Sequence, residues 1–210
     1  MTRLVAFGCS YTYGHSLEDC HIPPSNHGYY PSKTAWPNKL AEHMGISEVV
    51  NNGICGASNK SIWKSVVDFE FRHDDIVIIN WTFLTRHSFF NLYPNEDVFI
   101  LPRDVAYQWF YENLYSDYDS ILELRCRADH AKLHLDSKNI TNFHALLSVT
   151  HVNTEICDWS TVKFMDVDFD AIKNLHPYAL DGAHPNQAAH DQYAKELHAF
   201  LTREILKPSV

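Results

Sequence analysis

Seven consecutive residues, Asp75-Ile76-Val77-Ile78-Ile79-Asn80-Trp81, form the strongest strand signal in this sequence. The four residues from Ile76 to Ile79 are all apolar and β-branched, and no polar residue alternates with them. A strand covered on one face alternates apolar and polar residues, whereas a strand covered on both faces is apolar throughout. The run therefore predicts a central strand of a parallel sheet with helices on both sides.

Other strands and helices are expected to alternate along the chain. Strands are predicted over residues 3–7, 47–50, 142–149 and 161–165, and helices over residues 36–44, 58–71 and 185–206. Apolar residues also recur every three or four positions from 104 to 138, which predicts one long amphipathic helix or two in succession. The stretch 13–36 lacks a period and is expected to be a long loop that walls a site. The alternation predicts an α/β fold, a three-layer α/β/α sandwich in a single domain spanning residues 1–210.

Composition narrows the partners that such a domain can have. The formal net charge is −9, from 17 basic and 26 acidic residues, so no nucleic acid or anionic membrane partner is expected. No apolar run approaches the roughly 20 residues of a membrane span. The five cysteines are odd in number and contain no CxxC pair, so we expect free thiols in the cytoplasm. The oligomeric state stays open.

Two short motifs at opposite ends of the chain supply the groups of an acyl-transfer site. Ser10 follows the first predicted strand in Phe7-Gly8-Cys9-Ser10-Tyr11, and Asp181 precedes His184 by three residues just before the last helix. A serine hydroxyl becomes a nucleophile when an imidazole takes its proton and a carboxylate fixes the tautomer of that imidazole. Each of these residues is also common as a turn or helix cap, so neither motif is informative alone. Because ligands sit beyond the carboxyl ends of parallel strands, we expect Ser10 and residues 53–59 and 81–86 at one edge of the sheet.

Taken together, these features resemble the SGNH (GDSL-like) hydrolases, a family of esterases, lipases and carbohydrate deacetylases. Residues 7–11 stand where the family has its Gly-Asp-Ser block, with Cys9 in place of the aspartate, residues 51–59 match the second block, and residues 181–186 match the last. The resemblance implies a flavodoxin-like α/β/α sandwich with Ser10, Asp181 and His184 as catalytic triad. It also implies that Gly56 donates its backbone N–H to the oxyanion.

The third family block is not matched, because Leu84 stands near the position of an asparagine that donates to the oxyanion. Loss of one such donor typically costs about 2.7–4 kcal/mol of transition-state stabilisation. Four polar residues are candidates to replace it, namely Asn59, Asn80, Thr82 and Arg86. Asn59 is the first choice because it follows Gly56 in the same turn, although it also qualifies as a helix cap.

Several other residues have two interpretations. Trp81 and Arg86 are expected to line the substrate pocket, but a packed indole and a surface salt bridge are equally compatible with the sequence. Cys9 and Cys55 flank the proposed site and are better explained as small packed residues than as nucleophiles. The possible metal ligands are two groups, His15, His21 and His27 in one loop, and Asp166, Asp168 and Asp170 in another segment. Neither group has a recognised ligand spacing, so no metal and no cofactor is expected.

The sequence therefore predicts a serine esterase that hydrolyses an O-acetyl or other short acyl ester of a small molecule or carbohydrate. Two alternatives stay open. An acceptor alcohol in place of water would make the protein an acyltransferase. The missing asparagine of the third block instead favours a catalytically weak protein of this fold that serves as a binding or assembly module.

Overall fold

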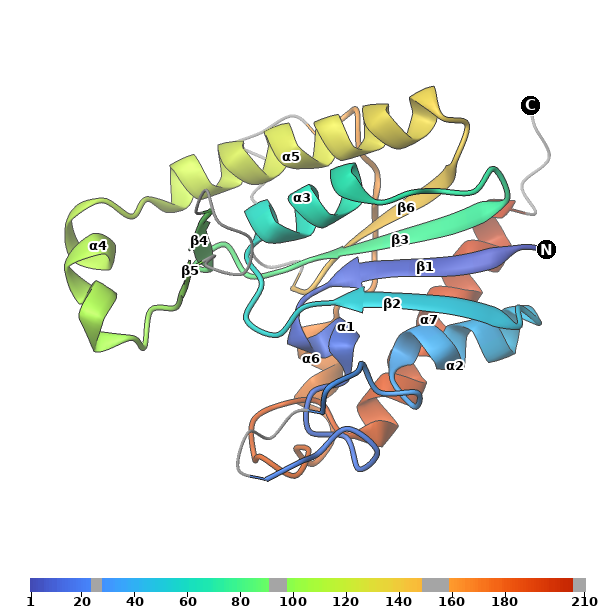
Figure 1. Ribbon diagram of the computed structural model, residues 1–210, viewed down its shortest axis with the longest axis horizontal. Coiled ribbons are helices and arrows are strands. Elements are labelled where there is room, and N and C mark those ends of the chain that lie inside the picture. Colours follow the sequence, from blue (N-terminus) through green and yellow to red (C-terminus); the bar gives the residue numbers. More distant parts are fainter. Residues whose placement is uncertain (24–27, 91–97, 149–158, 206–210) are drawn as a thin grey trace.

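A five-stranded parallel sheet forms the centre of the computed structural model, which describes residues 1–23, 28–90, 98–148 and 159–205 (Figure 1). Its strands are β1 (Arg3–Gly8), β2 (Glu48–Gly53), β3 (Asp75–Trp81), β6 (Thr141–Leu146) and β7 (Phe164–Met165). They lie in the order β2-β1-β3-β6-β7, and every neighbouring pair is parallel. This is the flavodoxin-like strand order, so the expected fold class is confirmed.

Helices cover both faces of the sheet (Figure 1). One layer contains α3 (Asn59–Asp68) and α5 (Asp117–Ser137), which pack on each other. The other contains α2 (Trp36–Met44) and α7 (Gln187–Ile205), which also form a contacting pair. Two short helices, α1 (Ser10–Tyr13) and α6 (Phe169–Lys173), lie near the carboxyl ends of the strands. Among the described residues, no helix is long and apolar enough to cross a membrane.

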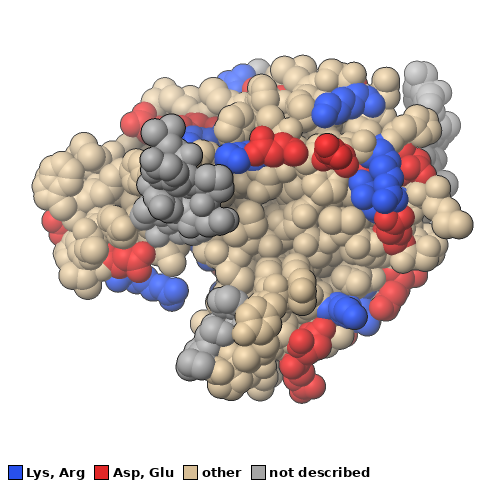
Figure 2. All heavy atoms as spheres, in the orientation of Figure 1, with Lys and Arg blue, Asp and Glu red and all other residues tan. Residues whose placement is uncertain are grey.

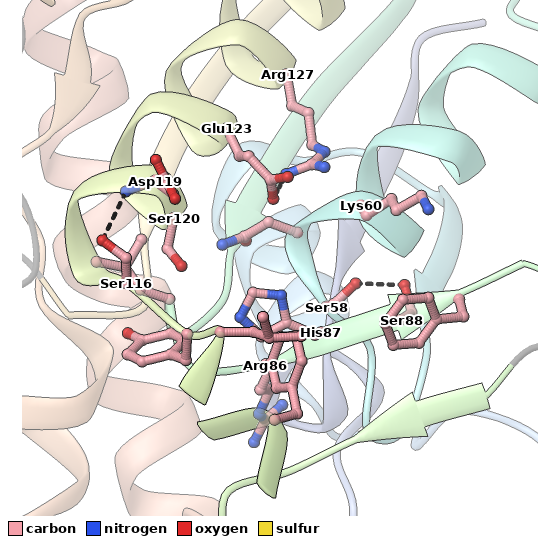
Figure 3. A pocket seen from close by; sticks show the side chains of 16 residues that line it. Ser58, Lys60, Arg86, His87, Ser88, Ser116, Asp119, Ser120, Glu123 and Arg127 are labelled. Atoms are coloured by element: carbon pink, nitrogen blue, oxygen red, sulfur yellow. Dashed lines mark hydrogen bonds and ion pairs between the residues drawn. The ribbon is translucent and has the colours of Figure 1, made fainter. Parts of the chain in front are cut away.

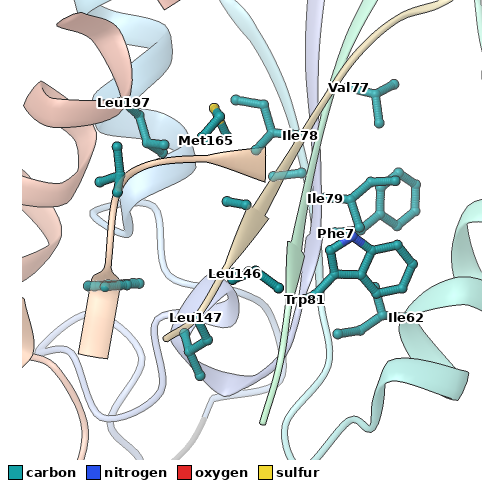
Figure 4. Close-up of a cluster of buried hydrophobic side chains, with 14 of the residues drawn as sticks. Phe7, Ile62, Val77, Ile78, Ile79, Trp81, Leu146, Leu147, Met165 and Leu197 are labelled. Atoms are coloured by element: carbon teal, nitrogen blue, oxygen red, sulfur yellow. The ribbon is translucent and has the colours of Figure 1, made fainter. Parts of the chain in front are cut away.

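The side chains of β3 explain why its sequence does not alternate. Successive residues of a strand point to opposite faces, and both faces of β3 are covered. Val77, Ile79 and Trp81 lie on the side of α3, whereas Ile78 lies on the side of α7 near Leu197 (Figure 4). All five side chains are fully buried. The apolar run therefore belongs to a central strand, as predicted.

The structure differs from the sequence predictions at the ends of β2 and α3 and on the buried face of α7. The β2 strand continues through Asn51–Asn52–Gly53, where a turn was expected, because Gly53 pairs with Gly8 and the Asn51 side chain accepts the N–H of Gly53. The helix expected over residues 58–71 ends at Asp68. In α7 the inward-facing alanines are Ala189 and Ala194, whereas the expected Ala188 is exposed.

The stretch 104–138 forms two α-helices rather than one, which is the second of the two expected arrangements. A short 3₁₀ turn (Val105–Tyr107) and α4 (Gln108–Asn113) precede α5. The hydroxyl of Ser116 accepts the N–H of Asp119 and caps the new helix, so the apolar register is interrupted and Leu114 is exposed. Within the predicted strand 142–149, Val149 lies outside the described residues.

The antiparallel ribbon of β4 (His87–Phe89) and β5 (Val98–Ile100) was not predicted. The ribbon and α4 project beyond the carboxyl ends of the central strands (Figure 1). In the same orientation, the surface is hollowed between this projection and the lower part of the molecule (Figure 2). The ribbon therefore forms one wall beside the edge of the sheet where Ser10 lies.

A buried ion pair joins β1 to β3 at the opposite, amino-terminal edge of the sheet. The Arg3 guanidinium donates to both carboxylate oxygens of Asp75, at 2.8 and 2.7 Å. Asp75 also accepts the backbone N–H of Arg72 at 2.8 Å. Asp75 is 2% exposed, so its charge depends on these partners instead of on water.

We expect Asp75→Asn to lower the free energy of unfolding by about 3–5 kcal/mol, because it leaves a buried arginine without its counter-charge. Urea unfolding followed by circular dichroism measures the change. Asp74→Asn is the matched control, since Asp74 is a more exposed carboxylate that contacts the N-terminal amine, and it should alter stability little. Equal losses in the two variants would show that the buried pair is not what stabilises this edge.

Candidate active site

Ser10 is held at the carboxyl end of β1 by close backbone packing. Helix α1 begins at Ser10, so the N–H of that residue has no acceptor within the helix. A Cβ added to Gly53 would lie 2.3 Å from the backbone nitrogen of Tyr13, so only glycine lets β2 approach α1 this closely. The Asn51 side chain also donates to the carbonyl of Thr12 at 2.7 Å. The end of β2 therefore fixes the helix that carries Ser10.

Asp181 and His184 are held by the turn that precedes α7. Gly182 has a φ of 72°, the left-handed conformation that favours glycine. This turn lets one oxygen of Asp181, Oδ1, accept the backbone N–H groups of Ala183 and His184, both at 3.0 Å. The second oxygen, Oδ2, is left to face the imidazole of His184.

The structure brings the serine, histidine and aspartate into one hydrogen-bonded chain. His184 Nδ1 lies 2.5 Å from Asp181 Oδ2, and His184 Nε2 lies 3.0 Å from Ser10 Oγ. A carboxylate can only accept, so Nδ1 carries the hydrogen and Nε2 is free to accept the hydroxyl hydrogen of Ser10. This is the tautomer that a general base requires.

The ionisation of the site suits the same role. Burial raises the pKa of Asp181, but the bonds from the backbone N–H groups and the imidazole of His184 outweigh it and hold the pKa well below its usual range. Burial lowers the pKa of His184, its contacts with Asp181 oppose this, and the charges of Arg86 and Arg103 lower it further. This lowering of the pKa favours the neutral imidazole, the form that can take a proton.

Two neighbours of His184 were not singled out from the sequence as part of the site. The Tyr11 ring meets the imidazole edge to face, with centroids 5.7 Å apart. The His15 ring is stacked on it, with centroids 4.1 Å apart and planes inclined by 23°. From the sequence, His15 was one of three loop histidines considered as possible metal ligands, in a loop that was expected to wall a site.

The second motif contributes a turn and a structural clamp. Gly56 adopts a φ of 79°, which fits the tight-turn interpretation. Asn59 Oδ1 accepts the N–H of Thr82 at 2.8 Å, and its Nδ2 donates to the carbonyl of Thr82 at 3.1 Å. Both ends of the Asn59 amide are therefore engaged in joining α3 to the segment after β3. These two bonds hold the Asn59 amide in place and use one of the two N–H groups of Nδ2, so the role of Asn59 as the missing oxyanion donor stays a prediction.

Of the candidates for the missing oxyanion donor, Arg86 is the one whose charge acts on the site. Asn80, Thr82 and Arg86 each have a buried polar side-chain atom without a hydrogen-bond partner, and in Arg86 this is Nη1. Only Arg86 carries a positive charge, which lowers the pKa of both His184 and Cys55. In Figure 3 its guanidinium points away from the pair of Glu123 and Arg127. Leu84, in the asparagine position, is a buried apolar residue.

Arg86 also lines a polar pocket of about 250 Å³ between the first turns of α3 and α5 (Figure 3). Ser58 and Ser88 share a hydrogen bond at one wall, with their hydroxyl oxygens 2.7 Å apart. Arg127 and Glu123 form an ion pair at another wall, at 2.8 Å. Leu84 and Asn59 also line this pocket, so it adjoins the segment where an oxyanion donor is missing.

Trp81 is packed inside the core, contrary to the expectation of a substrate contact. Its side chain is fully buried in the core, and its Nε1 donates to Nδ1 of His144 at 3.1 Å. Burial lowers the pKa of His144 to about 3, so this imidazole is neutral and can accept the bond. The packed-indole interpretation is the correct one.

The cysteines near the site are packed or protonated, and the nearby aspartates cap a helix or form an ion pair. Cys9 is buried, and burial raises the pKa of Cys55 to about 12, so its thiol stays protonated and is a poor nucleophile. Asp168 caps α6 through the N–H of Ala171, and Asp170 pairs with Lys173 at 2.8 Å. Of the three loop histidines considered as possible metal ligands, His27 lies outside the described residues.

Comparison with known proteins assigns the fold. No protein-family model matches the chain, and no curated protein matches it in sequence. A member of the lipolytic protein G-D-S-L family from Veillonella parvula has a similar structure, with a TM-score of 0.53 at 13% identity over 97% of this chain and 100% of the other. This likeness shows that the chain has the α/β/α fold of the G-D-S-L (SGNH) hydrolases.

Two carbohydrate esterases share the same fold. One is an acetyl xylan esterase from Butyrivibrio proteoclasticus, with a TM-score of 0.58 at 12% identity. The other is a family two carbohydrate esterase from Clostridium thermocellum, with a TM-score of 0.54 at 12% identity. The likeness covers 97% of this chain but 64% of each esterase.

Proposed function

We propose that the protein is a serine esterase that removes an O-acetyl or other short acyl group from a small molecule or carbohydrate. The hydrogen-bonded chain from Ser10 Oγ through His184 to Asp181 is the observation that carries the proposal. The fold supports it, because G-D-S-L lipolytic proteins and carbohydrate esterases have the same architecture. The substrate class is drawn from these neighbours.

In the proposed reaction, Ser10 Oγ attacks the ester carbonyl while His184 Nε2 takes the hydroxyl proton. The tetrahedral intermediate collapses, the carbon–oxygen bond to the alcohol breaks, and His184 returns the proton to the leaving alcohol. Water then attacks the acyl-enzyme, with His184 again as the base, and releases the carboxylic acid. Asp181 keeps the imidazole in the required tautomer and stabilises its charged form.

The oxyanion of this reaction would be held by the backbone N–H groups of Ser10 and Gly56, with Arg86 as the third donor. The Ser10 N–H has no acceptor within α1, and Arg86 Nη1 has no hydrogen-bond partner in the described structure. A guanidinium beside a developing negative charge supplies more than a neutral amide can, because the interaction includes a full positive charge. Arg86 is preferred here to Asn59, because it adds this charge and because Asn59 holds Thr82 through both ends of its amide.

We extend the proposal to the organisation of the chain. Ser10 and His184 are 174 positions apart and meet at one sheet edge, which supports a single domain over residues 1–210. The described cysteines are free, and the cytoplasmic location stays a prediction from cysteine usage. Contact with nucleic acid is not part of the proposal.

A second candidate is a binding or assembly module that has lost efficient catalysis. The buried Leu84 in place of an oxyanion donor favours it, because an incomplete oxyanion hole slows acyl transfer. An acyltransferase is a variant of the first proposal, in which an acceptor alcohol enters in place of water. Product analysis with and without added alcohols separates hydrolysis from transfer.

Ser10→Ala is expected to reduce hydrolysis of p-nitrophenyl acetate by at least about 10³-fold in kcat, since removal of the nucleophile leaves only the oxyanion hole and binding. Circular dichroism and the urea midpoint confirm that the variant is folded. Cys9→Ala, which removes the neighbouring buried thiol, is the matched control and should keep most of the activity. Full activity in a folded Ser10→Ala protein would rule out the proposed nucleophile.

Arg86→Met is expected to lower kcat by about 10²–10³-fold, the loss that follows removal of one oxyanion donor. Because the Arg86 charge lowers the pKa of His184, its removal should raise that pKa. The base works when unprotonated, so kcat/KM falls as the pH decreases through this pKa, and the fall should occur at higher pH in the variant. Arg127→Met, which removes an arginine paired with Glu123, should change neither quantity. An unaltered kcat and pH profile in Arg86→Met would remove Arg86 from the site.

A further inference from the structure

The His184 imidazole has a stacked neighbour, the His15 ring, that has no step in the proposed ester hydrolysis. The two ring centroids are 4.1 Å apart and the planes are inclined by 23°. The His15 side chain is 14% exposed and that of His184 is 20% exposed, so water has little access to the contact. A nearly parallel stack this close places the face of one ring over the face of the other.

Bonds from the backbone and from Cys55 hold His15 in this place. Gly14, with a φ of 80°, turns the chain at the end of α1, and the backbone N–H of His15 then donates to the carbonyl of Ser10 at 3.1 Å. The Nδ1 atom of His15 lies 3.3 Å from the sulfur of Cys55. Burial raises the pKa of the Cys55 thiol to about 12, so the thiol keeps its hydrogen and can donate it to Nδ1. The ring is therefore fixed at its backbone and at one of its nitrogens.

The same bonding determines what a neutral His15 ring offers to the site. With Nδ1 accepting from Cys55, the hydrogen of the neutral ring is on Nε2, which faces Asp181 Oδ2 at 3.7 Å. A carboxylate can only accept, so this tautomer suits both neighbours. The distance is too long for a hydrogen bond, and His184 Nδ1, at 2.5 Å, stays the partner of that oxygen. His15 therefore acts on His184 chiefly through the face of its ring.

We propose that His15 is a positioning residue, whose ring keeps the His184 imidazole directed at Ser10 and stabilises the imidazolium that forms during acyl transfer. The role rests on the proposed ester hydrolysis. As Ser10 Oγ bonds to the carbonyl carbon, its proton moves to His184 Nε2 and the imidazole becomes a cation. A cation over the face of a neutral aromatic ring is attracted to it, most strongly where water is excluded. Because this attraction arises only after the proton has moved, it favours the transition state over the bound ester.

Other groups also act on the charge of His184. Asp181 favours the imidazolium, whereas the charges of Arg86 and Arg103 oppose it. Burial itself lowers the pKa of His184, so a substitution that opened the site to water would raise this pKa for a separate reason. Two side chains that fill the same space are therefore needed to isolate the effect of the ring face. Neighbouring titratable groups that are uncharged or have an ion-pair partner of their own are Tyr11, Cys55, His190 and Lys173.

His15→Phe and His15→Leu are matched variants, since both remove the ring nitrogens and fill the space, but only phenylalanine has an aromatic face. NMR of the imidazole nitrogens, with His184→Ala to assign the signal, measures the pKa of His184. We expect this pKa to be higher in His15→Phe than in His15→Leu by about half a unit or more. Equal pKa values in the two folded variants would overturn the inference. In the unaltered protein at pH 8, the same spectra should show a neutral His15 with its hydrogen on Nε2, and a charged His15 would also overturn it.

The effect on the reaction is measured with p-nitrophenyl acetate at a pH where His184 is unprotonated in both variants, so that the amount of active base is the same. His15→Leu should then have a kcat about 2- to 30-fold below that of His15→Phe. Equal kcat values would overturn the role of His15 in the reaction. If the pKa values differ as expected but no form of the protein hydrolyses an ester, the stabilisation of the imidazolium stands and the proposed function fails. Ester hydrolysis with equal pKa values would leave the proposed function standing without His15.

Discussion

The Asp181 carboxylate is the interaction on which the candidate site depends. One oxygen accepts two backbone N–H groups and so fixes the turn, while the other accepts the imidazole hydrogen of His184. The same group therefore determines both where His184 lies and which of its nitrogens is free. Because these bonds hold the Asp181 pKa low, the carboxylate stays ionised over the range in which His184 titrates. The stacking of His15 on this pair adds a second imidazole beside the same oxygen.

The parallel sheet supplies the other constraint, since its carboxyl edge is where residues from both ends of the chain meet. Gly8 pairs with Gly53 at the ends of β1 and β2, and neither position has room for a side chain. Helix α1 can then pack directly on the end of β2, which places Ser10 opposite His184. The projection formed by the β4–β5 ribbon and α4 lies beside the same edge, and Arg86 immediately precedes β4. The carboxyl edge of the sheet is therefore where Ser10, His184 and Arg86 come together.

Features with a strong local pattern were predictable from the sequence. The apolar run of β3 indicated a strand covered on both faces, and the alternation of strands and helices indicated the α/β/α sandwich. Features set by distant contacts were not. The β4–β5 ribbon has strands of three residues, too short for a period, and the clamp of Asn59 on Thr82 depends on a loop 23 positions away. His15 looked like one of several loop histidines until its stacking on His184 was known.

The central claim is that Ser10 is an activated nucleophile, and covalent labelling with a fluorophosphonate probe tests it most directly. Such probes react with serines whose hydroxyl is deprotonated by a neighbouring base, so the reaction does not depend on knowing the natural ester. Intact-mass analysis should show one probe per chain, and peptide mapping should locate it on Ser10. Labelling should be lost in Ser10→Ala and strongly slowed in His184→Ala. No labelling of the folded protein, or equal labelling of Ser10→Ala, would contradict the account.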